Sequence, residues 1–546
     1  MLESIERSNL NILFMSTKEL KEVAKNDSLQ SLSSWMATSQ PPAQPSLTKN
    51  LRTQVCVIGG GIAGITTAYL LAQQGKKVVL LTAGEVGGSN ANTARTTAHL
   101  SNAVDDRYTE IERLHGQENS RLVAQSHTAA ISKIEAIAET EGIECDFERV
   151  DGYLFTPPGE SSESLYRELE AAQRAGLSQV EMVDHAPIQG FNTGPCLRFP
   201  EQGQFHPLKY LNGLAQAIVR DGGQIYTNTA VSRIKGGKLA QLRTAQGYIV
   251  TAEAVVVATN APINDLWAAS NNDLIGISAK QAAYRTYVIA GRVPTGSVTK
   301  ALYWDTPDPY HYIRLQKGEA KEGEAPYDLL MVGGEDHKTG QEDDGEQRYQ
   351  RLEQWTRERF PMMEKLEYWW SGQVMESVDG LAFIGHDQVA PPNVYIATGD
   401  SGMGMTHGTI AGMILSDLIL GRKNSWANLY DPSRVTLGAA PDFIQETANL
   451  VAQYTDWLTP GEVDSTGQIQ SGEGAIMRRG LRKVAVHRDE QGILHQRSAI
   501  CPHLGCIVAW NSSEKSWDCP CHGSHFSANG KVLNGPSIHG LGQVNT

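Results

Sequence analysis

Four residues near the C-terminus have the types and the spacing of metal ligands. Cys501 and His503 form a C-x-H pair, and Cys519 and His522 form a C-x-x-H pair that begins after fifteen further residues. Two thiolates and two imidazoles suit either a tetrahedral zinc ion or a [2Fe–2S] cluster in which two histidines replace two cysteines on one iron. Zinc fingers usually pair cysteine with cysteine and histidine with histidine, whereas each half here supplies one of each. The spacing therefore favours the iron–sulfur cluster.

Three glycines near the start of the chain form a second group. Gly59, Gly61 and Gly64 make a G-x-G-x-x-G pattern between a β-branched run and an apolar segment of helical period. The first glycine permits a tight turn, the second admits a pyrophosphate, and the third lets a helix pack on a strand. The acid expected after the next strand, as a ribose ligand, is replaced by Thr82, and Glu85 follows three residues later. The motif predicts a dinucleotide site in which Thr82 or Glu85 contacts the ribose.

A third group lies on a strand predicted within the stretch "YHYIRL". Period-two alternation places Tyr310, Tyr312 and Arg314 on one face of that strand. Arginine is the natural clamp for a carboxylate, so these residues are candidate substrate contacts. A sheet face whose long side chains lie along its surface would give the same pattern. The sequence leaves both interpretations open.

The chain around these groups predicts the elements that would hold them. Residues 54–82 pass from a strand to a helix and back to a strand, which is a β-α-β unit. Further strands are predicted at 252–260 and 394–400, and the second leads into a helix at about 406–420. A helical segment at 441–458 ends before Pro460-Gly461, and short strand-like pieces follow.

Composition limits the classes of function. A chain of 546 residues predicts two to four domains, and a net charge of −14 leaves no basic surface for nucleic acid. A mean hydropathy of −0.33 and the lack of a long apolar run predict no transmembrane segment. The N-terminus lacks the features of a secretory signal, and Cys56, Cys145 and Cys196 suit the core of a protein in a reducing compartment. We therefore expect a cytoplasmic location.

Several segments resemble one flavoprotein family. The β-α-β unit and the strings "YWWSGQVMESVDGLAFIG" and "YIATGDSGMGMTHGT" resemble the FAD-dependent oxidoreductases that include D-amino acid and glycine oxidases, over residues of about 53–421. The resemblance implies FAD rather than NAD. It also implies that residues 92–100 line the flavin and raises His99 as a covalent anchor, although we predict non-covalent FAD. The flavin contacts that it implies at the second glycine turn and its helix are Gly402, Met403, Gly404, Met405 and Thr406.

The strings "CPHLGC" and "CPCHGS" resemble the Rieske proteins of quinol-oxidising complexes. This resemblance implies that Cys501 and Cys519 hold the inner iron and that His503 and His522 hold the outer iron. It also implies a disulfide that ties the two loops together, between Cys506 and Cys521, and a proline loop at "NGPS", residues 534–537. One position departs from those proteins, because Phe526 stands where they have a tyrosine whose hydroxyl bonds a ligand sulfur.

Together the two resemblances predict the fold class and the domains. We expect an α/β, Rossmann-like FAD-binding domain with an inserted α+β substrate domain, followed by a small all-β Rieske domain. The first fifty residues, which end in a Ser/Gln/Pro-rich stretch with little to bury, are predicted to be an extension or linker. The oxidoreductase should span 51–430, with FAD-binding parts at about 51–150, 200–270 and 370–430. A helical connector should follow at 431–460, and the Rieske domain should span 461–546.

A flavoprotein fused to a Rieske domain resembles a group of bacterial oxidoreductases of the glycine/D-amino acid oxidase-like kind. We expect a dehydrogenase that oxidises an amine or amino acid-type small molecule. Its electrons would pass singly through the [2Fe–2S] cluster to an external acceptor, a quinone or a soluble carrier. The alternative is a redox relay or sensor without catalysis, or a reductase in which electrons enter through the cluster.

Overall fold

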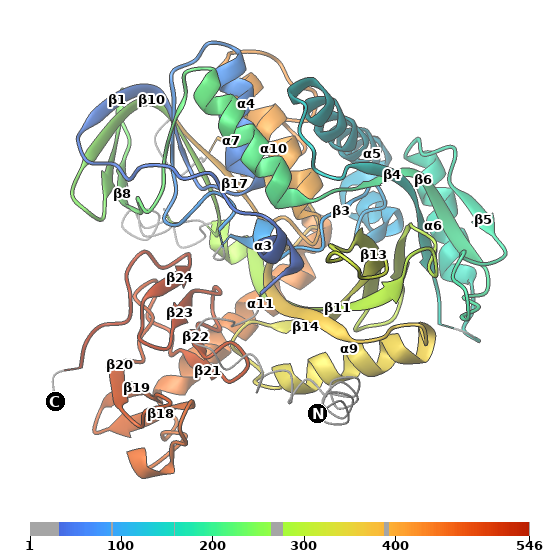
Figure 1. Cartoon of the computed structure of the whole chain (residues 1–546). Coiled ribbons are helices and arrows are strands. Elements are labelled where there is room, and N and C mark those ends of the chain that lie inside the picture. Colours follow the sequence, from blue (N-terminus) through green and yellow to red (C-terminus); the bar gives the residue numbers. More distant parts are fainter. Residues whose placement is uncertain are drawn as a thin grey trace.

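The computed structural model describes residues 32–88, 91–157, 159–261, 263, 277–386 and 393–544. Most of the predicted N-terminal extension lies outside the described residues. Two large sheets form the body of the chain, and two small antiparallel sheets form a C-terminal part beside it (Figure 1). The predicted fold class is therefore confirmed.

The first large sheet carries the glycine motif. Its strands follow the order β16-β17-β10-β1-β2-β7, and the β8-β9 hairpin extends from β10. Val55 and Val57 of β1 face a core shared with the helices, whereas Cys56 and Ile58 face a core shared with the hairpin. Both faces of the sheet are covered at β1, which explains why the sequence of this strand is almost continuously apolar. The strands are β1 (Leu51–Ile58), β2 (Val78–Leu81), β7 (Gln224–Tyr226), β8 (Val231–Lys235), β9 (Ala240–Thr244), β10 (Ile249–Asn260), β16 (Phe383–His386) and β17 (Val394–Thr398).

Helices α4 (Ile62–Gln73), α7 (Pro207–Arg220) and α10 (Gly404–Ile419) pack together on one side of this sheet (Figure 1). The β-α-β unit predicted at residues 54–82 is β1, α4 and β2. Strands β1, β2 and β10 run parallel to one another. Their carboxyl ends therefore meet at one edge of the sheet, where ligands bind in folds of this kind.

The second large sheet is the inserted one, and it supplies the floor of the site. Its strands follow the order β15-β11-β14-β13-β12-β4-β6-β3, with β5 paired to β6. Helix α9 (Gly345–Arg359) packs on β11 and β14, and α5 (Arg107–Glu141) packs on α6 (Glu163–Arg174). The strands are β3 (His99–Leu100), β4 (Glu148–Phe155), β5 (Glu181–Val183), β6 (Cys196–Gln204), β11 (Gln281–Pro294), β12 (Leu302–Asp305), β13 (His311–Lys317), β14 (Tyr327–Lys338) and β15 (Leu366–Ser377).

The C-terminal part consists of a three-stranded and a four-stranded antiparallel sheet. Helix α11 (Ala440–Gln453) and a 3₁₀ turn at Tyr454–Trp457 precede it, close to the helical segment predicted at 441–458. The strands of the first small sheet are β18 (Gly474–Arg479), β19 (Arg482–Arg488) and β20 (Leu494–Ser498). Those of the second are β21 (Ala509–Asn511), β22 (Ser516–Asp518), β23 (His525–Ser527) and β24 (Val532–Asn534).

A buried network of charges joins the C-terminal part to the second large sheet. Arg285 of β11 donates from Nη2 to Asp518 Oδ2 at 3.0 Å and from Nη1 to Ser371 Oγ at 2.8 Å. Asp518 also bonds the ring of His525, and Ser371 donates to Glu514 at 2.9 Å. Burial opposes the ionisation of Asp518, but the positive charges of Arg285 and His525 outweigh it and hold its pKa well below the usual range. These hydrogen bonds and charges join the two parts, although Nε of Arg285 is buried without a partner among the described residues.

The expectation that the Ser/Gln/Pro-rich stretch has little to bury is wrong for residues 33–38. Helix α3 (Ser34–Thr38) places Trp35 in the main core, where it is fully buried. Trp35 Nε1 donates to the carbonyl of Thr96 at 2.6 Å, and Ser33 Oγ donates to that of Ala94 at 2.6 Å. This segment thus packs against the loop that precedes β3.

Candidate functional site

One cavity of about 700 Å³ brings together the predicted dinucleotide and substrate residues. Its wall is formed by the glycine turn after β1, the N-terminus of α10 and the floor of the second large sheet. A fourth part of the wall comes from the C-terminal domain, at residues 532–535, 537 and 538. The cavity is therefore shared by two domains that are far apart in sequence.

The dinucleotide end of the cavity is shaped by three glycines. A Cβ on Gly59 would lie 2.2 Å from the carbonyl of Ala258, and one on Gly64 would lie 2.1 Å from the carbonyl of Gly59. These two glycines permit the close approach of strands and helix. Gly61 is the N-cap of α4, where free backbone N–H groups and the helix dipole favour a phosphate. The backbone fits the pyrophosphate of FAD, as the motif predicts.

Thr82 and Glu85 both line the same end of the cavity. Thr82 is 8% exposed, and its side chain lies against Gly60 of the glycine turn. A contact between the ribose and either of these side chains stays a prediction.

The second glycine turn forms another part of the cavity wall. Gly402, Met403, Gly404 and Met405 line the cavity, and α10 begins at Gly404 with its N-terminus toward it. Thr406 does not line the cavity. Its hydroxyl lies 2.9 Å from Nδ1 of His127 instead. A helix N-terminus at this place suits the negative charge that a reduced flavin carries.

His99 borders the cavity, but its geometry speaks against covalent attachment of the flavin. Its Nδ1 lies 3.0 Å from the hydroxyl of Thr97, and its Nε2 lies 3.2 Å from the carbonyl of Ile313. Burial lowers the pKa of this imidazole to about 3, and the charge of Arg314 adds to the effect. Both ring nitrogens are thus engaged within the protein.

The expectation that Arg314 clamps a substrate carboxylate does not agree with the structure. Its Nη1 donates to three backbone carbonyls, those of Thr97, Ala98 and Phe205, at 2.9–3.2 Å. Arg314 is 2% exposed and does not line the cavity, and its guanidinium lies over the ring of Trp35. These contacts hold the loop before β3 in place, so the role of Arg314 is structural.

Tyr310 and Tyr312 do line the cavity. The Tyr310 hydroxyl donates to Asp105 Oδ2 at 3.2 Å, and the Tyr312 hydroxyl lies 2.7 Å from that of Thr286. Three acidic residues that sequence reasoning missed border the cavity near them: Asp105, Asp336 and Asp400. Each comes from a different segment of the chain, so spacing gave no signal for the group.

The predicted cluster ligands lie together in the C-terminal domain. The rings of His503 and His522 are 5.0 Å apart and perpendicular, and both residues are 5% exposed. Three buried ring nitrogens have no hydrogen-bond partner among the described residues: both nitrogens of His503 and Nδ1 of His522. The thiols of Cys501 and Cys519 are buried beside each other. Orphaned imidazoles beside paired thiols fit a cluster with two cysteine and two histidine ligands.

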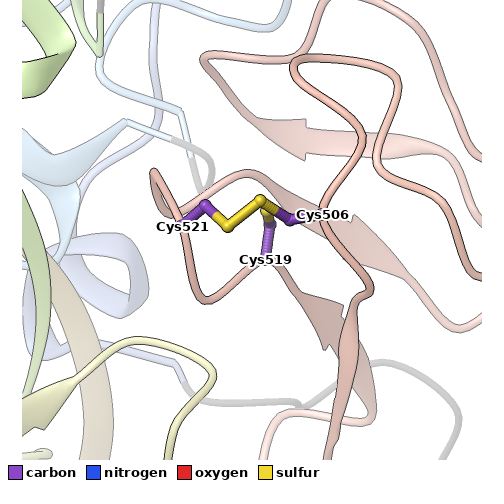
Figure 2. A group of neighbouring side chains, drawn as sticks. All are labelled: Cys506, Cys519 and Cys521. Carbon is purple, nitrogen blue, oxygen red and sulfur yellow. A yellow bond between two sulfur atoms is a disulfide. The ribbon is translucent and has the colours of Figure 1, made fainter. Parts of the chain in front are cut away.

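Figure 2 shows the disulfide between Cys506 and Cys521, with Cys519 directly beside it. The disulfide joins the two ligand loops, as the resemblance implied. The thiol of Cys519 is the main cause that lowers the pKa of Cys501, and Ser524 adds to the effect. The Oγ of Ser524 accepts from the Ser537 amide at 3.0 Å.

Phe526 is fully buried in the same core as the ligand cysteines. It offers no hydroxyl to them. His525, in the same strand, bonds Asp518.

The loop that resembles the Rieske proline loop is the part of the domain that reaches the cavity. Asn534 Nδ2 donates to Asn92 Oδ1 at 3.2 Å, and Gln373 Nε2 donates to the carbonyl of Gly523 at 3.1 Å. Gly523 directly follows the ligand His522. One ligand loop and the proline loop therefore both contact the flavin-binding part. The sequence carried no signal for this contact, because it depends on how the domains dock.

Comparison with known proteins agrees with this geometry. The family model for FAD dependent oxidoreductase matches residues 54–418, and the model for the Rieske [2Fe-2S] domain matches residues 459–545. The chain therefore belongs to the FAD-dependent oxidoreductase family and carries a C-terminal Rieske domain. It is an oxidoreductase that binds FAD and a [2Fe–2S] cluster.

Among its relatives is the Rieske 2Fe-2S iron-sulfur protein YhfW of Bacillus subtilis, 32% identical over 93% of this chain and 97% of that protein. Gamma-glutamylputrescine oxidoreductase of Escherichia coli is 27% identical over 73% of this chain and 92% of its own length. The crystal structure of glycine oxidase from Geobacillus kaustophilus matches with a TM-score of 0.58 and 18% identity, over 70% of this chain and 99% of that one. No helix among the described residues is long and apolar enough to cross a membrane.

Proposed function

We propose that this protein oxidises an amine or amino acid-type small molecule at the flavin and passes the electrons singly to its own Rieske cluster. An external acceptor, a quinone or a soluble carrier, then removes them. When bound, FAD accepts a hydride from a C–H bond and the cluster accepts one electron at a time. The observation that carries the proposal is the shared cavity, whose wall includes both flavin-binding turns and residues 532–538 of the Rieske domain.

The residues of the second large sheet that line the cavity are suited to contact the substrate. Tyr310 and Tyr312, from the turn before β13 and from β13 itself, line the cavity, and Asp105 contacts both Tyr310 and the turn at Gly402. The substrate class is supported by relatives whose names give amine or amino acid substrates, gamma-glutamylputrescine oxidoreductase and glycine oxidase. A one-electron centre built into the same cavity favours a dehydrogenase over an oxidase.

Anaerobic rapid mixing tests the proposal. The holoprotein is mixed with candidate amines and amino acids, flavin absorbance is followed, and samples frozen at successive times are examined by EPR. We expect the flavin to bleach and the signal of the reduced cluster to follow, at a rate that does not change with protein concentration. A cluster rate proportional to protein concentration would refute transfer within one chain.

The opposite direction of flow makes a different prediction. If electrons enter through the cluster, no amine bleaches the flavin, and a one-electron donor reduces the cluster first and the flavin afterwards. That result would replace the dehydrogenase proposal with a reductase or a redox relay.

A further inference from the structure

The substrate side of the cavity carries more negative than positive charge. Asp105, Asp336 and Asp400 line it, and Tyr310 and Tyr312 stand beside them. The carboxylate of Asp105 lies against Gly402, since a Cβ there would meet its Oδ2 at 2.3 Å. The acids thus lie where the sheet floor meets the flavin turn, which is where a substrate would be held.

Two of these carboxylates each have one oxygen without a partner. Among the described residues, Oδ1 of Asp336 and Oδ1 of Asp400 are buried and have no hydrogen-bond partner. Burial, together with the charge of Asp105, raises the pKa of Asp336 to about 7, although a hydrogen bond from Thr286 and the charge of Arg348 oppose the shift. Burial also raises the pKa of Asp400 to about 6. A buried carboxylate without a partner is costly unless a cation or a donor meets it.

The arginines near the cavity do not offer a ready clamp for an anion. Arg314 is bonded to backbone carbonyls and lies outside the cavity wall. Arg107 borders the cavity, and its Nη1 donates to the carbonyl of Asp105 at 2.8 Å. Arg95 also lines the cavity, but its Nη1 donates to the carbonyl of Ser371 at 2.9 Å and lies 3.7 Å from Glu514. A substrate carboxylate on the sheet floor would therefore meet aspartates.

We infer that the substrate is a cationic amine without a carboxylate, and that it carries a second positive charge, as a diamine or polyamine does. Asp105 and Asp336 bind the ammonium group distant from the oxidised carbon, and the rings of Tyr310 and Tyr312 contact the methylene chain. Aromatic faces add to the binding of ammonium groups, and carboxylates form charge-assisted hydrogen bonds with them. This inference rests on the proposed oxidation of amines and names the class of amine.

Four compounds with four carbons each test the inference by calorimetry on the holoprotein. Butane-1,4-diamine carries two positive charges, butan-1-amine carries one, and 4-aminobutanoate and 2-aminobutanoate carry a carboxylate. We expect the diamine to bind at least tenfold more tightly than the monoamine, and both amino acids to bind more weakly still. Equal or tighter binding of either amino acid would overturn the inference.

Substitutions locate the effect. Asp336→Asn keeps the shape of the side chain and should weaken diamine binding about tenfold, while it leaves the affinity for butan-1-amine nearly unchanged. Asp105→Asn should act in the same direction and provides a second variant if the first does not fold. Asp184→Asn is the control, because Asp184 is an exposed acid outside the cavity. An equal loss in the control, or no loss in either cavity variant, would overturn the inference.

The same compounds separate this inference from the proposed function. If an amino acid bleaches the flavin better than the diamine does and the cluster is then reduced, the diamine inference fails and the proposed function stands. If the diamine binds as predicted but no compound bleaches the flavin, the proposed function fails and the charge preference of the cavity stands.

Discussion

The buried pair between Arg285 and Asp518 makes the docking of the Rieske domain testable. Their side chains are 5% and 2% exposed, and the pair joins β11 to the strand that leads into Cys519. Arg285→Met removes the charge and the hydrogen bonds to Asp518 and Ser371 while it keeps an unbranched chain of similar reach. Breaking a buried pair by removing one partner costs about 3–5 kcal/mol. The ratio of docked to undocked domains should therefore fall by a factor of about 10² to 4 × 10³, at 1.4 kcal/mol for each tenfold change.

The assay is the rate at which cluster reduction follows flavin reduction, read by freeze-quench EPR, together with limited proteolysis near Leu458. Leu458 is 84% exposed and lies at the start of the link to the Rieske domain. We expect slower transfer and faster cleavage in Arg285→Met. Arg292→Met is the matched control, because Arg292 lies on the same strand and its ion pair with Glu367, at 2.6 Å, stays within the flavin-binding part. If both variants keep the wild-type rate and cleavage pattern, the network does not hold the domains together.

Three further substitutions test single assignments. Gly61→Val should abolish FAD binding in a folded protein, because a side chain would enter the space through which the backbone approaches the pyrophosphate; flavin retained after gel filtration would contradict this. Arg314→Lys should lower the free energy of unfolding by about 1–3 kcal/mol and leave KM unchanged, because buried carbonyls lose their donor; a large rise in KM with unchanged stability would restore the clamp. Phe526→Tyr should raise the potential of the cluster, by about 59 mV for each 1.4 kcal/mol of new hydrogen bonding; an EPR redox titration without an upward shift would show that the ring does not face a ligand sulfur.

The sequence allowed prediction of the parts of the site that are built from one or two loops. The spacing of the four ligands indicated the cluster, because each loop supplies one cysteine and one histidine, whereas the disulfide was implied by the resemblance to Rieske proteins. The glycine turn was predictable for a similar reason. Gly59, Gly61 and Gly64 join a strand to the helix that follows it, so the contacts they make are short in sequence.

Contacts between distant segments could not be predicted in this way. Period-two alternation placed Arg314 with Tyr310 and Tyr312, but its partners are carbonyls at residues 97, 98 and 205. A buried side chain on a strand can bond to backbone groups of any segment that packs against it. The local sequence pattern does not show which segment that is. Trp35 was missed because a short helix inside a polar stretch shows its single apolar anchor only after folding.

The cavity wall that the Rieske domain supplies links the loading of the two cofactors during biosynthesis. Residues 532–538 reach the flavin cavity only when the domain is folded and docked, and its two ligand loops are arranged around the site of the cluster. A chain made under iron limitation would therefore lack one wall of its flavin cavity as well as its cluster. Iron supply would then govern how much flavin the protein retains, and the two cofactor contents would rise and fall together.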